Sequence, residues 1–320
     1  MIKPQIRVRL YTDDDRNLWE GFLKSNNSYS FQFSRNFLDV SKNKGFDSSL
    51  IIEVQSKPVG VFPNLYINSN NTETVSHAGS SYGGILPKSR TSTSTLLAYY
   101  EAIANYAKKE TYIKTMSFRI PPDCVKRHIE HDIHWVMWKL GARVESCYLH
   151  TAINLNNRTE ADKSRINLAR IPSELQIIIG DSDDLVNLWT FVSDVLENRH
   201  GIKTVHTLDE ITFLANSFPK NILMFFAKMD KDIVAATIFF NTVDSFRLQY
   251  MAVSELGRSI SAGDYLILQA IKLAKELGFS YFDFGHSQES GGRFLNDSLM
   301  SFKMKFGGSN YAAFTYSLWL

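Results

Sequence analysis

Polar side chains crowd the stretch from Tyr281 to Gly308, directly after a segment that is typical of a buried strand. "YFDFG" alternates aromatic residues with Asp283, and "HSQESGG" then brings His286, Ser287 and Glu289 together. Imidazoles and carboxylates exchange protons, and hydroxyls bind polar ligands. Functional side chains are common where a core strand passes into a loop. The sequence therefore predicts a site of acid–base chemistry here.

Within this stretch, each polar residue has a functional and a structural interpretation. Glu289 precedes the flexible "SGG", so its carboxylate could accept a proton, bind a hydroxyl or form a loop salt bridge. Asp283 alternates with Phe282 and Phe284, so it points away from the aromatic face and serves either catalysis or a structural hydrogen bond. Asn296 could bind a ligand or form a turn.

Cations follow in the same stretch and in an earlier helix. Lys303 and Lys305 alternate with apolar residues in "FKMKFGG", which predicts a strand with both ammonium groups on one face. Such a pair suits a diphosphate or carboxylate, although lysines also protect edge strands. Arg199 and His200 end a predicted helix, where phosphate binding competes with helix capping, and His206 is a further candidate for substrate contact.

A second group of candidates lies in "SHAGSSYGGILPKSRTSTST". His77 and Tyr82 occupy a predicted loop, where they could face a substrate or pack in the core. Two glycines and two cations then precede a hydroxyl-rich helix start: Gly83, Gly84, Lys88 and Arg90. Backbone N–H groups and two cations predict a diphosphate site, with a solvated helix cap as the alternative.

Metal binding and covalent catalysis are not indicated. The spacing of His128, His131 and His134 spreads their side chains around a helix, and no acidic ligands accompany them, so we expect no metal. Cys124 and Cys147 are the only cysteines and form no CxxC motif, which favours a reducing compartment. No Ser-His-Asp or Cys-His motif predicts a covalent intermediate.

Composition limits the partners. The net charge of +2 arises from 35 basic and 33 acidic residues that are interspersed, which disfavours long nucleic acids and fits a small phosphate-bearing molecule. The longest apolar run, "IVAATIFF", is too short to cross a bilayer, so we expect a cytoplasmic protein. A chain of 320 residues with 44% hydrophobic residues can build two cores.

Two similar series of elements must position these residues. In the first half, the periodicity predicts strands over 6–11, 48–55, 57–68, 72–86 and 112–120, with helices over 13–24, 33–44 and 91–109. In the second half, it predicts strands over 175–180, 222–253 with two turns, and 279–285, with helices over 184–197, 208–216 and 261–278.

The helix-to-strand segments of the two halves, residues 96–120 and 265–285, share one pattern, which indicates an internal duplication. We therefore predict two α/β domains, residues 1–155 and 156–320. Each has a mixed, mostly antiparallel sheet flanked by helices rather than a doubly wound parallel sheet.

This order of elements resembles the GNAT acyltransferase superfamily, and two such halves resemble its FemAB-like tandem branch. The resemblance covers nearly the whole chain and is carried by "SHAGSSYGG", "ENRHGIKTVHTLDEI", "LQYMAVSELGRSISAGDYL" and the "DFGHSQES" to "FKMKFGG" stretch. It implies transfer of an acyl group, of 3-hydroxybutanoyl type, from acyl-CoA to a dTDP- or UDP-linked amino deoxysugar for O-antigen or capsule synthesis. The amine would attack the thioester directly.

The resemblance also implies roles for particular residues. Backbone N–H groups of the splayed fourth strand would contact the thioester oxygen, at Gln249, Tyr250, Met251 and Val253. For the other roles the sequence itself offers candidates: Tyr82 could protonate the thiolate, and the base could be Glu289, Asp283, His77, His200, His206 or His286. The counterpart of the diphosphate loop is "RSISAG", with Arg258, Ser261 and Gly263. It departs from the family pattern, because Ser261 replaces a glycine and Asp264 adds a negative charge, so a plain helix cap is the alternative.

Two other functions are compatible with the sequence. An aminoacyl-tRNA-dependent transferase is the second activity that the FemAB resemblance implies, but the balanced charge and the absence of a charged helical arm disfavour RNA binding. A non-catalytic sugar-nucleotide-binding module would explain the altered "RSISAG" loop, but not the dense polar cluster after Phe284.

Overall fold

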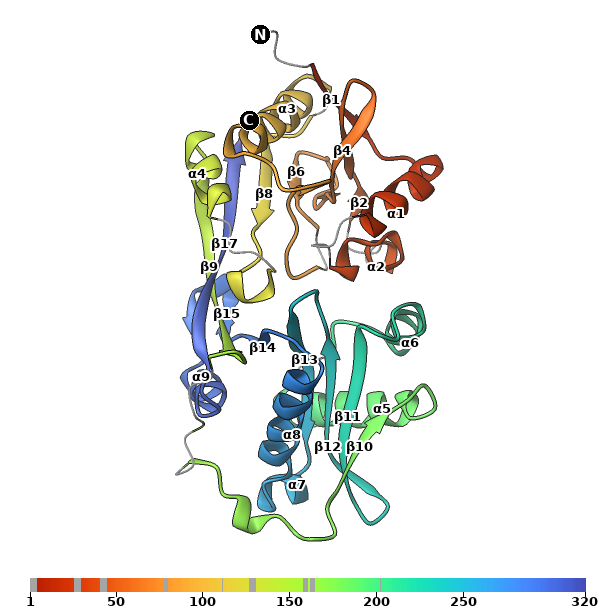
Figure 1. Cartoon of the computed structure of the whole chain (residues 1–320), viewed down its shortest axis with the longest axis vertical. Helices are drawn as coiled ribbons and strands as arrows, with labels where there is room; N and C mark the ends of the chain where they lie inside the picture. The colour runs from red at the N-terminus through yellow and green to blue at the C-terminus, as the bar shows by residue number, and fades with distance from the viewer. Residues whose placement is uncertain are drawn as a thin grey trace. The chain divides into compact units, whose positions relative to one another are not determined.

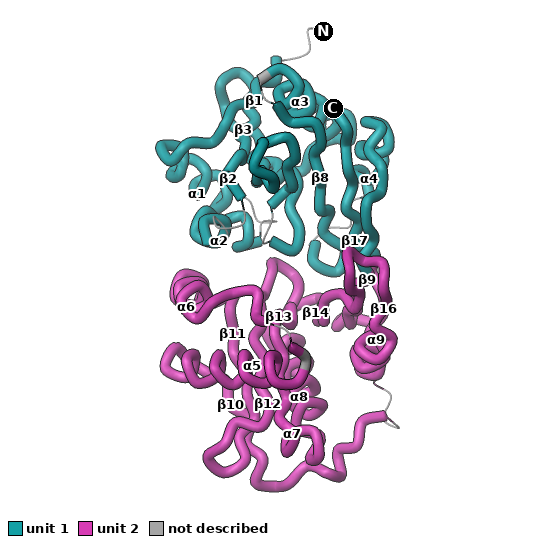
Figure 2. Tube along the Cα trace, turned by 180° about the vertical axis from the view of Figure 1, so that it is seen from behind, with its two compact units in different colours: residues 1–148, 312–320 teal, residues 149–311 magenta. Residues whose placement is uncertain are grey.

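The computed structural model of the chain describes residues 5–25, 30–40, 45–77, 80–110, 112–126, 131–157, 161, 165–201 and 203–320, without the side chains of Glu110 and His200. It divides into unit 1, residues 1–148 with 312–320, and unit 2, residues 149–311 (Figure 2). These units differ from the predicted division at residue 155, because β9 (Arg143–Asn154) and β17 (Ser309–Trp319) each contribute residues to both. The duplication itself stays a prediction.

Unit 1 contains a four-stranded antiparallel sheet of order β1-β3-β4-β7. Its strands are β1 (Ile6–Leu10), β3 (Leu50–Val54), β4 (Lys57–Phe62) and β7 (Leu86–Pro87). Successive side chains of a strand point to opposite faces. Accordingly, Ile52 packs in one core with the helix α3 (Thr93–Glu110), and Ile51 packs in another with α1 (Arg16–Lys24).

A second set of strands in unit 1 has the order β17-β8-β6-β5-β2. These strands are β2 (Phe46–Asp47), β5 (Leu65–Tyr66), β6 (Glu73–Val75) and β8 (Thr115–Arg119). The strand predicted over 57–68 is thus divided between two sheets at Pro63, which cannot donate a ladder hydrogen bond. β6 and β8 are parallel and joined through α3, while α4 (Asp132–Lys139) packs in the same core (Figure 1).

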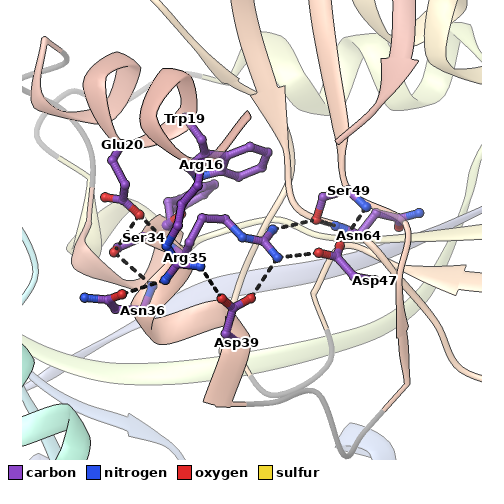
Figure 3. Close-up of polar contacts among 11 residues, drawn as sticks. Arg16, Trp19, Glu20, Ser34, Arg35, Asn36, Asp39, Asp47, Ser49 and Asn64 are labelled. Atoms are coloured by element: carbon purple, nitrogen blue, oxygen red, sulfur yellow. Dashed lines mark hydrogen bonds and ion pairs between the residues drawn. The ribbon is translucent and has the colours of Figure 1, made fainter. Parts of the chain in front are cut away.

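The buried charge of Arg35 fixes the short helix α2 (Arg35–Leu38) in unit 1. Arg35 is 2% exposed, and its guanidinium lies 4.1 Å from the ring centre of Tyr11. Figure 3 shows it between the carboxylates of Asp39, at 2.9 Å, and Asp47. A buried guanidinium is tolerated when carboxylates pair with it. α2 is shorter than the helix predicted over 33–44, and residues 41–44 of that prediction lie outside the described part.

Unit 2 contains the meander that the sequence predicts, followed by a parallel crossover. The strands β10 (Gln176–Gly180), β11 (Ile222–Met229), β12 (Asp232–Phe240) and β13 (Ser245–Val253) are antiparallel in that order. β14 (Tyr281–His286) pairs parallel with β13 and antiparallel with β9. The crossover from β13 to β14 runs through α7 (Glu255–Ser259) and α8 (Ala262–Glu276), and Gly278 follows with the left-handed φ of +83° that a helix end needs.

Helices cover both faces of this sheet. The apolar side of α8 packs on one face with Phe246 and Phe282, while Trp189 of α5 (Leu185–His200) packs edge-on against Tyr250 on the other (Figure 1). α6 (Leu208–Ser217) begins with a capping box in which Thr207 and Glu210 bond each other's backbone N–H groups. The predicted fold class is confirmed. No described helix is long and apolar enough to cross a membrane.

The strand predicted for "FKMKFGG" is wrong. Lys303 lies in the helix α9 (Asp297–Met304), and Lys305 follows its last turn. Asn296 caps this helix by accepting a 2.9 Å hydrogen bond from the Leu299 N–H, and Asp297 adds a favourable negative charge to the first turn. These start signals outweigh the two-residue alternation. α9 is preceded by the hairpin of β15 (Gln288–Glu289) and β16 (Phe294–Leu295).

Candidate active site

The parallel strands β13 and β14 of unit 2 pair over only three residue pairs. Ser245, Phe246 and Arg247 pair with Tyr281, Phe282 and Asp283. β13 then continues to Val253 and β14 to His286 without further pairing to one another. We call this unpaired portion, Leu248–Val253 opposite Phe284–His286, the strand divergence. Backbone groups of β13 that face β14 here do not form a ladder with it.

A β-bulge coincides with the strand divergence. Phe239 of β12 pairs with Leu248, but Ile238 pairs with Tyr250, so Gln249 is the extra residue. The alternation of side chains changes there. Leu248 and Met251 both pack with the α8 core, whereas Tyr250 lies on the opposite face against Trp189. The candidate oxyanion residues Gln249, Tyr250, Met251 and Val253 thus begin at the bulge and line the divergent part of β13.

At the last pair before the strand divergence, Asp283 is fully buried and bonded to His150. The two carboxylate oxygens lie 3.2 and 3.3 Å from His150 Nδ1, and the Gly285 N–H donates to the carboxylate at 2.7 Å. Arg247 Nε lies 3.7 Å away. Burial alone would raise the pKa of Asp283, but the partners His150, Arg247 and Gly285 N–H lower it to about 2. Asp283 is therefore ionised in the folded protein at neutral pH.

The Asp283 carboxylate orients the imidazole of His150. Because Nδ1 faces the carboxylate, Nε2 is the nitrogen left for other partners, and it makes no hydrogen bond within the described part of the chain. An imidazole held in this way can take a proton at Nε2 while the carboxylate stabilises the resulting charge. The arrangement is that of a general base with its orienting group.

Sequence reasoning missed His150 and Arg247. His150 lies in "CYLHTAIN", which is typical of a strand, and 133 positions separate it from Asp283. Arg247 lies in "SFRLQY", a pattern shared by many half-buried strands. Only the β9–β14 and β13–β14 registers bring both beside Asp283. A polar residue inside a mostly apolar run was the one available signal for His150.

Three predicted residues join the same cluster. Lys303 is buried, and its Nζ donates to the carbonyl oxygens of Gly285, at 3.0 Å, and His286. Burial lowers the pKa of Lys303 to about 8, although Asp283 partly opposes this. Partial desolvation and the nearby cations lower the pKa of His286 below its usual value. Ser287 is buried, and its hydroxyl has no hydrogen-bond partner in the described residues.

Glu289 and Asn296 lie outside this cluster. Glu289 is exposed on the β15–β16 hairpin and accepts a 2.9 Å hydrogen bond from Asn296 Nδ2. Asn296 also caps α9. Both contacts are structural uses of these side chains. Roles for them in substrate binding or base catalysis stay predictions.

Other second-half candidates are spread over unit 2. His206 Nδ1 lies 2.6 Å from the hydroxyl of Tyr250, and both rings are buried. Burial raises the pKa of Tyr250 to about 12. Arg199 is exposed near the end of α5, and the side chain of His200 lies outside the described residues.

The N-terminus of α8 lies against the far end of the strand divergence. A Cβ added at Gly263 would lie 2.8 Å from Val253 Cγ2, so glycine allows the helix start to approach β13 closely. Ser261 precedes the helix with a left-handed φ of 58°, and no side chain caps the first turn. The unsatisfied N–H groups in the first turn of α8 can therefore bind an anion.

The acidic residue that argued against an anion site is neutralised. Lys305 Nζ lies 2.7 and 2.8 Å from the two carboxylate oxygens of Asp264. Lys303, in α9, thus bonds carbonyl groups at the end of β14, and Lys305, directly after α9, pairs with Asp264. The two ammonium groups do not share one face of a strand. Arg258 donates to the Val253 carbonyl at 2.7 Å and ties α7 to β13.

The glycine-rich loop of unit 1 has structural explanations. A Cβ at Gly83 would lie 2.2 Å from the Ser76 carbonyl oxygen, and Gly84 has a φ of +99°. Ser92 caps α3 by accepting a 3.2 Å hydrogen bond from the Thr95 N–H, and Thr93 donates to the Asp132 carboxylate. One N–H group at the start of α3 is therefore already hydrogen-bonded, and the carboxylate of Asp132 lies near the same helix start.

Exposed cations and buried polar residues accompany this loop. Lys88 and Arg90 are exposed, and His77 and Tyr82 are buried. His77 has a left-handed φ of 61°. A non-glycine residue in this region is uncommon and is held by its surroundings. Roles of these four residues in substrate binding or catalysis stay predictions.

Comparison with known proteins agrees with the unit 2 geometry. The family model described as an acetyltransferase (GNAT) domain matches residues 156–294. No curated protein matches the chain in sequence.

Solved structures share the fold at low sequence identity. FemX has a TM-score of 0.67 and 12% identity, with 98% of this chain and 97% of that chain covered. L-PGS from Bacillus licheniformis has a TM-score of 0.59 and 15% identity, covering 95% and 91%. A tandem GNAT protein from the clavulanic acid biosynthesis pathway has a TM-score of 0.54 and 11% identity, covering 98% of each chain. Residues 156–294 thus match the model of a GNAT acetyltransferase domain, and the chain is similar in fold to a tandem GNAT protein.

Proposed function

We propose that this protein is an N-acyltransferase that moves an acyl group from acyl-CoA to the amine of a nucleotide-linked amino deoxysugar. The observation that carries the proposal is the arrangement of unit 2. The strand divergence has an uncapped helix start at one end and the buried Asp283–His150 pair at the other. A diphosphate-bearing thioester needs these two environments, an anion site and a reacting site.

The N-terminus of α8 would hold the CoA diphosphate. The N–H groups of Ala262, Gly263 and Asp264 in the first turn have no side-chain cap, and the helix dipole favours negative charge there. Lys305 removes the repulsion that Asp264 would otherwise exert. We therefore assign the CoA diphosphate to unit 2 rather than to the Gly83–Arg90 loop.

The reacting groups would meet at the start of the strand divergence. A backbone N–H of β13 near the bulge would bond the thioester oxygen and stabilise the negative charge that develops on it. His150 Nε2 would take the proton of the attacking amine. The new N–C bond forms as the C–S bond breaks, and the thiolate takes up the proton that His150 releases. No acyl-enzyme is required.

The acceptor assignment follows the resemblance to amino-sugar N-acyltransferases and the chemistry of the cluster. Lys303, His286 and Ser287 add cationic and hydroxyl groups beside Asp283. Such a mixture suits a polar, phosphate-linked acceptor.

A second function has a specific observation in its favour. Ser261 replaces a loop glycine, so the loop before α8 departs from the family pattern of a diphosphate site. An aminoacyl-tRNA donor would not need a CoA diphosphate site. The chain is similar in fold to FemX and L-PGS, which makes this the alternative to test.

The deciding experiment measures release of free thiol with a panel of acyl-CoAs and dTDP- or UDP-linked amino sugars. We expect free thiol to be released only when both substrates are present, with one amide formed for each thiol released. A parallel reaction supplies charged tRNA as donor. Absence of thiol release from every pair, together with transfer from charged tRNA, would show that the acyl-CoA assignment is wrong.

A further inference from the structure

The turn between β12 and β13 carries buried polar side chains that lack partners. Asn241 is 1% exposed, and neither atom of its amide is hydrogen-bonded within the described part of the chain. The hydroxyls of Thr242 and Ser245 are also buried and unbonded there. Thus, four donor or acceptor atoms lie within five consecutive residues without a partner.

The backbone of the same turn is fully organised. The Asn241 N–H donates to the Asn221 carbonyl at 2.7 Å, and Asn221 Nδ2 donates to the Asn241 carbonyl at 3.0 Å. The Thr242 N–H donates to the Ser245 carbonyl at 2.9 Å. Because the main chain is fixed, the unbonded side chains do not result from a loose loop. Buried polar groups without partners are costly, and native proteins keep few of them.

The position of the turn connects it to the candidate active site. Ser245 and Arg247 are two residues apart on β13, so their side chains emerge on the same face. Arg247 is the register partner of Asp283, which holds His150. Ser245 is the partner of Tyr281 on the same strand, β14. Ser245 thus lies on the strand that carries Arg247, the register partner of Asp283, and Asn241 and Thr242 lie in the turn just before this strand.

The chemistry of these groups selects a ligand class. An amide offers two N–H donors and a carbonyl acceptor, and each hydroxyl both donates and accepts. None of the three side chains carries a charge, and Arg247 already faces the Asp283 carboxylate at 3.7 Å. Uncharged groups that donate and accept match the hydroxyls of a sugar ring better than a phosphate or an alkyl chain.

We infer that Asn241, Thr242 and Ser245 bind the ring hydroxyls of the amino-sugar acceptor and so hold its amine beside His150. This inference rests on the proposed function, because it names the acceptor subsite of that reaction. Sugar hydroxyls complete the hydrogen bonds that these side chains lack in the free protein. A site built for hydroxyls also discriminates against acceptors that lack them, since its polar groups would then remain unbonded.

The test uses Thr242→Val and Asn241→Leu, with Thr237→Val as the matched control. Thr237 is also a fully buried threonine of this hairpin, but its hydroxyl donates to the Phe225 carbonyl at 3.2 Å. Thr242→Val removes a hydroxyl that is unbonded in the free protein, so the thermal midpoint should stay the same or rise. Thr237→Val removes a satisfied hydrogen bond, so its midpoint should fall.

Steady-state kinetics with the acceptor found by thiol release give the second readout. We expect Thr242→Val to raise the acceptor KM about fivefold and Asn241→Leu about tenfold or more, since each loses hydrogen bonds to substrate. The KM for acyl-CoA should not change in either variant. The control Thr237→Val should leave both KM values unchanged.

Two outcomes would overturn the inference. If Thr242→Val and Asn241→Leu lower the thermal midpoint and leave the acceptor KM unchanged, the side chains hold structural waters, while the proposed function stands. If no amino sugar supports thiol release, the proposed function fails first. The turn is then tested by calorimetry with a dTDP-linked 3-amino-3,6-dideoxyhexose. No binding, or equal binding by wild type and Asn241→Leu, would show that the turn does not bind sugar.

Discussion

At the scale of single residues, the polar stretch after β14 divides into a buried and an exposed part. Asp283 and Lys303 both bond backbone groups at the end of β14, at Gly285 and His286, and Ser287 is buried directly after this strand. Glu289 lies on an exposed hairpin. The sequence predicted that the stretch holds chemistry, and the periodicity placed Asp283 off the aromatic face. It could not identify His150 as its partner, because that contact depends on strand register across 133 positions.

Replacing either His150 or Glu289 by Gln distinguishes between two candidates for the general base. His150 is the candidate that the structure indicates, and Glu289 is one that the sequence predicts. We expect His150→Gln to lower kcat about 10²- to 10⁴-fold, the usual contribution of a general base. Glu289→Gln should change kcat less than twofold by this account, because its carboxylate is exposed and bonded to Asn296. Steady-state thiol release measures both. A large loss in Glu289→Gln with full activity in His150→Gln would assign the base to Glu289.

The pH dependence of stability tests the Asp283 partners. The folded-state pKa of Asp283 is about 2, below its ordinary value of 3.8. Its stabilising contribution is therefore complete above about pH 4 and is lost as the pH falls towards 2. This shift corresponds to roughly 2 kcal/mol. The difference in unfolding free energy between wild type and Asp283→Asn, measured in urea, should shrink as the pH falls from 4 towards 2. A constant difference down to pH 3 would contradict the assignment.

At the scale of elements, helix starts explain more of the candidate site than residue identity does. The sequence located α3 and α8 and both loops before them, but it could not show which helix start is capped. Ser92 and Asp132 bond groups at the start of α3, whereas the acid at the start of α8, Asp264, is paired with Lys305. The prediction of a strand for Lys303 and Lys305 failed for a related reason. A two-residue alternation predicts a strand only where no capping signal precedes it.

Replacing Lys305 tests the anion site at α8. Lys305→Met leaves the Asp264 carboxylate uncompensated in the first helical turn, so we expect the KM for acyl-CoA to rise about three- to tenfold. The double variant Asp264→Asn with Lys305→Met should restore it, because the repulsion is then gone. Lys88→Ala with Arg90→Ala is the control in the unit 1 loop and should leave this KM unchanged. An opposite pattern would move the CoA diphosphate to unit 1.

Replacing Gly83 tests the close approach in the unit 1 loop. A Cβ at Gly83 would lie 2.2 Å from a backbone oxygen, which cannot move aside as a side chain can. We expect Gly83→Ala to lower the unfolding free energy by about 2 kcal/mol or more. Gly21→Ala, in the interior of α1 with nothing within 4 Å of its Cβ, should raise it by about 0.5–1 kcal/mol. Urea titrations compare the two. Equal stability of Gly83→Ala and wild type would mean that the loop is not tightly packed.

At the scale of the whole molecule, local patterns predicted the order of elements, but long-range pairing determined the compact units. The duplicated sequence pattern places a boundary near residue 155, whereas β9 and β17 each pass from one unit into the other. Each unit still has the same core motif, a strand, a crossover helix and a parallel strand: β6, α3 and β8 in unit 1, and β13, α8 and β14 in unit 2. Among the residues that the structure describes, only those of unit 2 combine this motif with an uncapped helix start and an oriented histidine.

The central claim is that acyl-CoA binds and reacts in unit 2. The most direct measurement is a crystal structure with a non-reactive thioether analogue of acyl-CoA. We predict density for the diphosphate at the N–H groups of Ala262, Gly263 and Asp264, with the sulfur atom in the strand divergence and the acyl carbon facing His150. Density for the diphosphate at the start of α3, or no binding at millimolar concentrations of the analogue, would contradict the account.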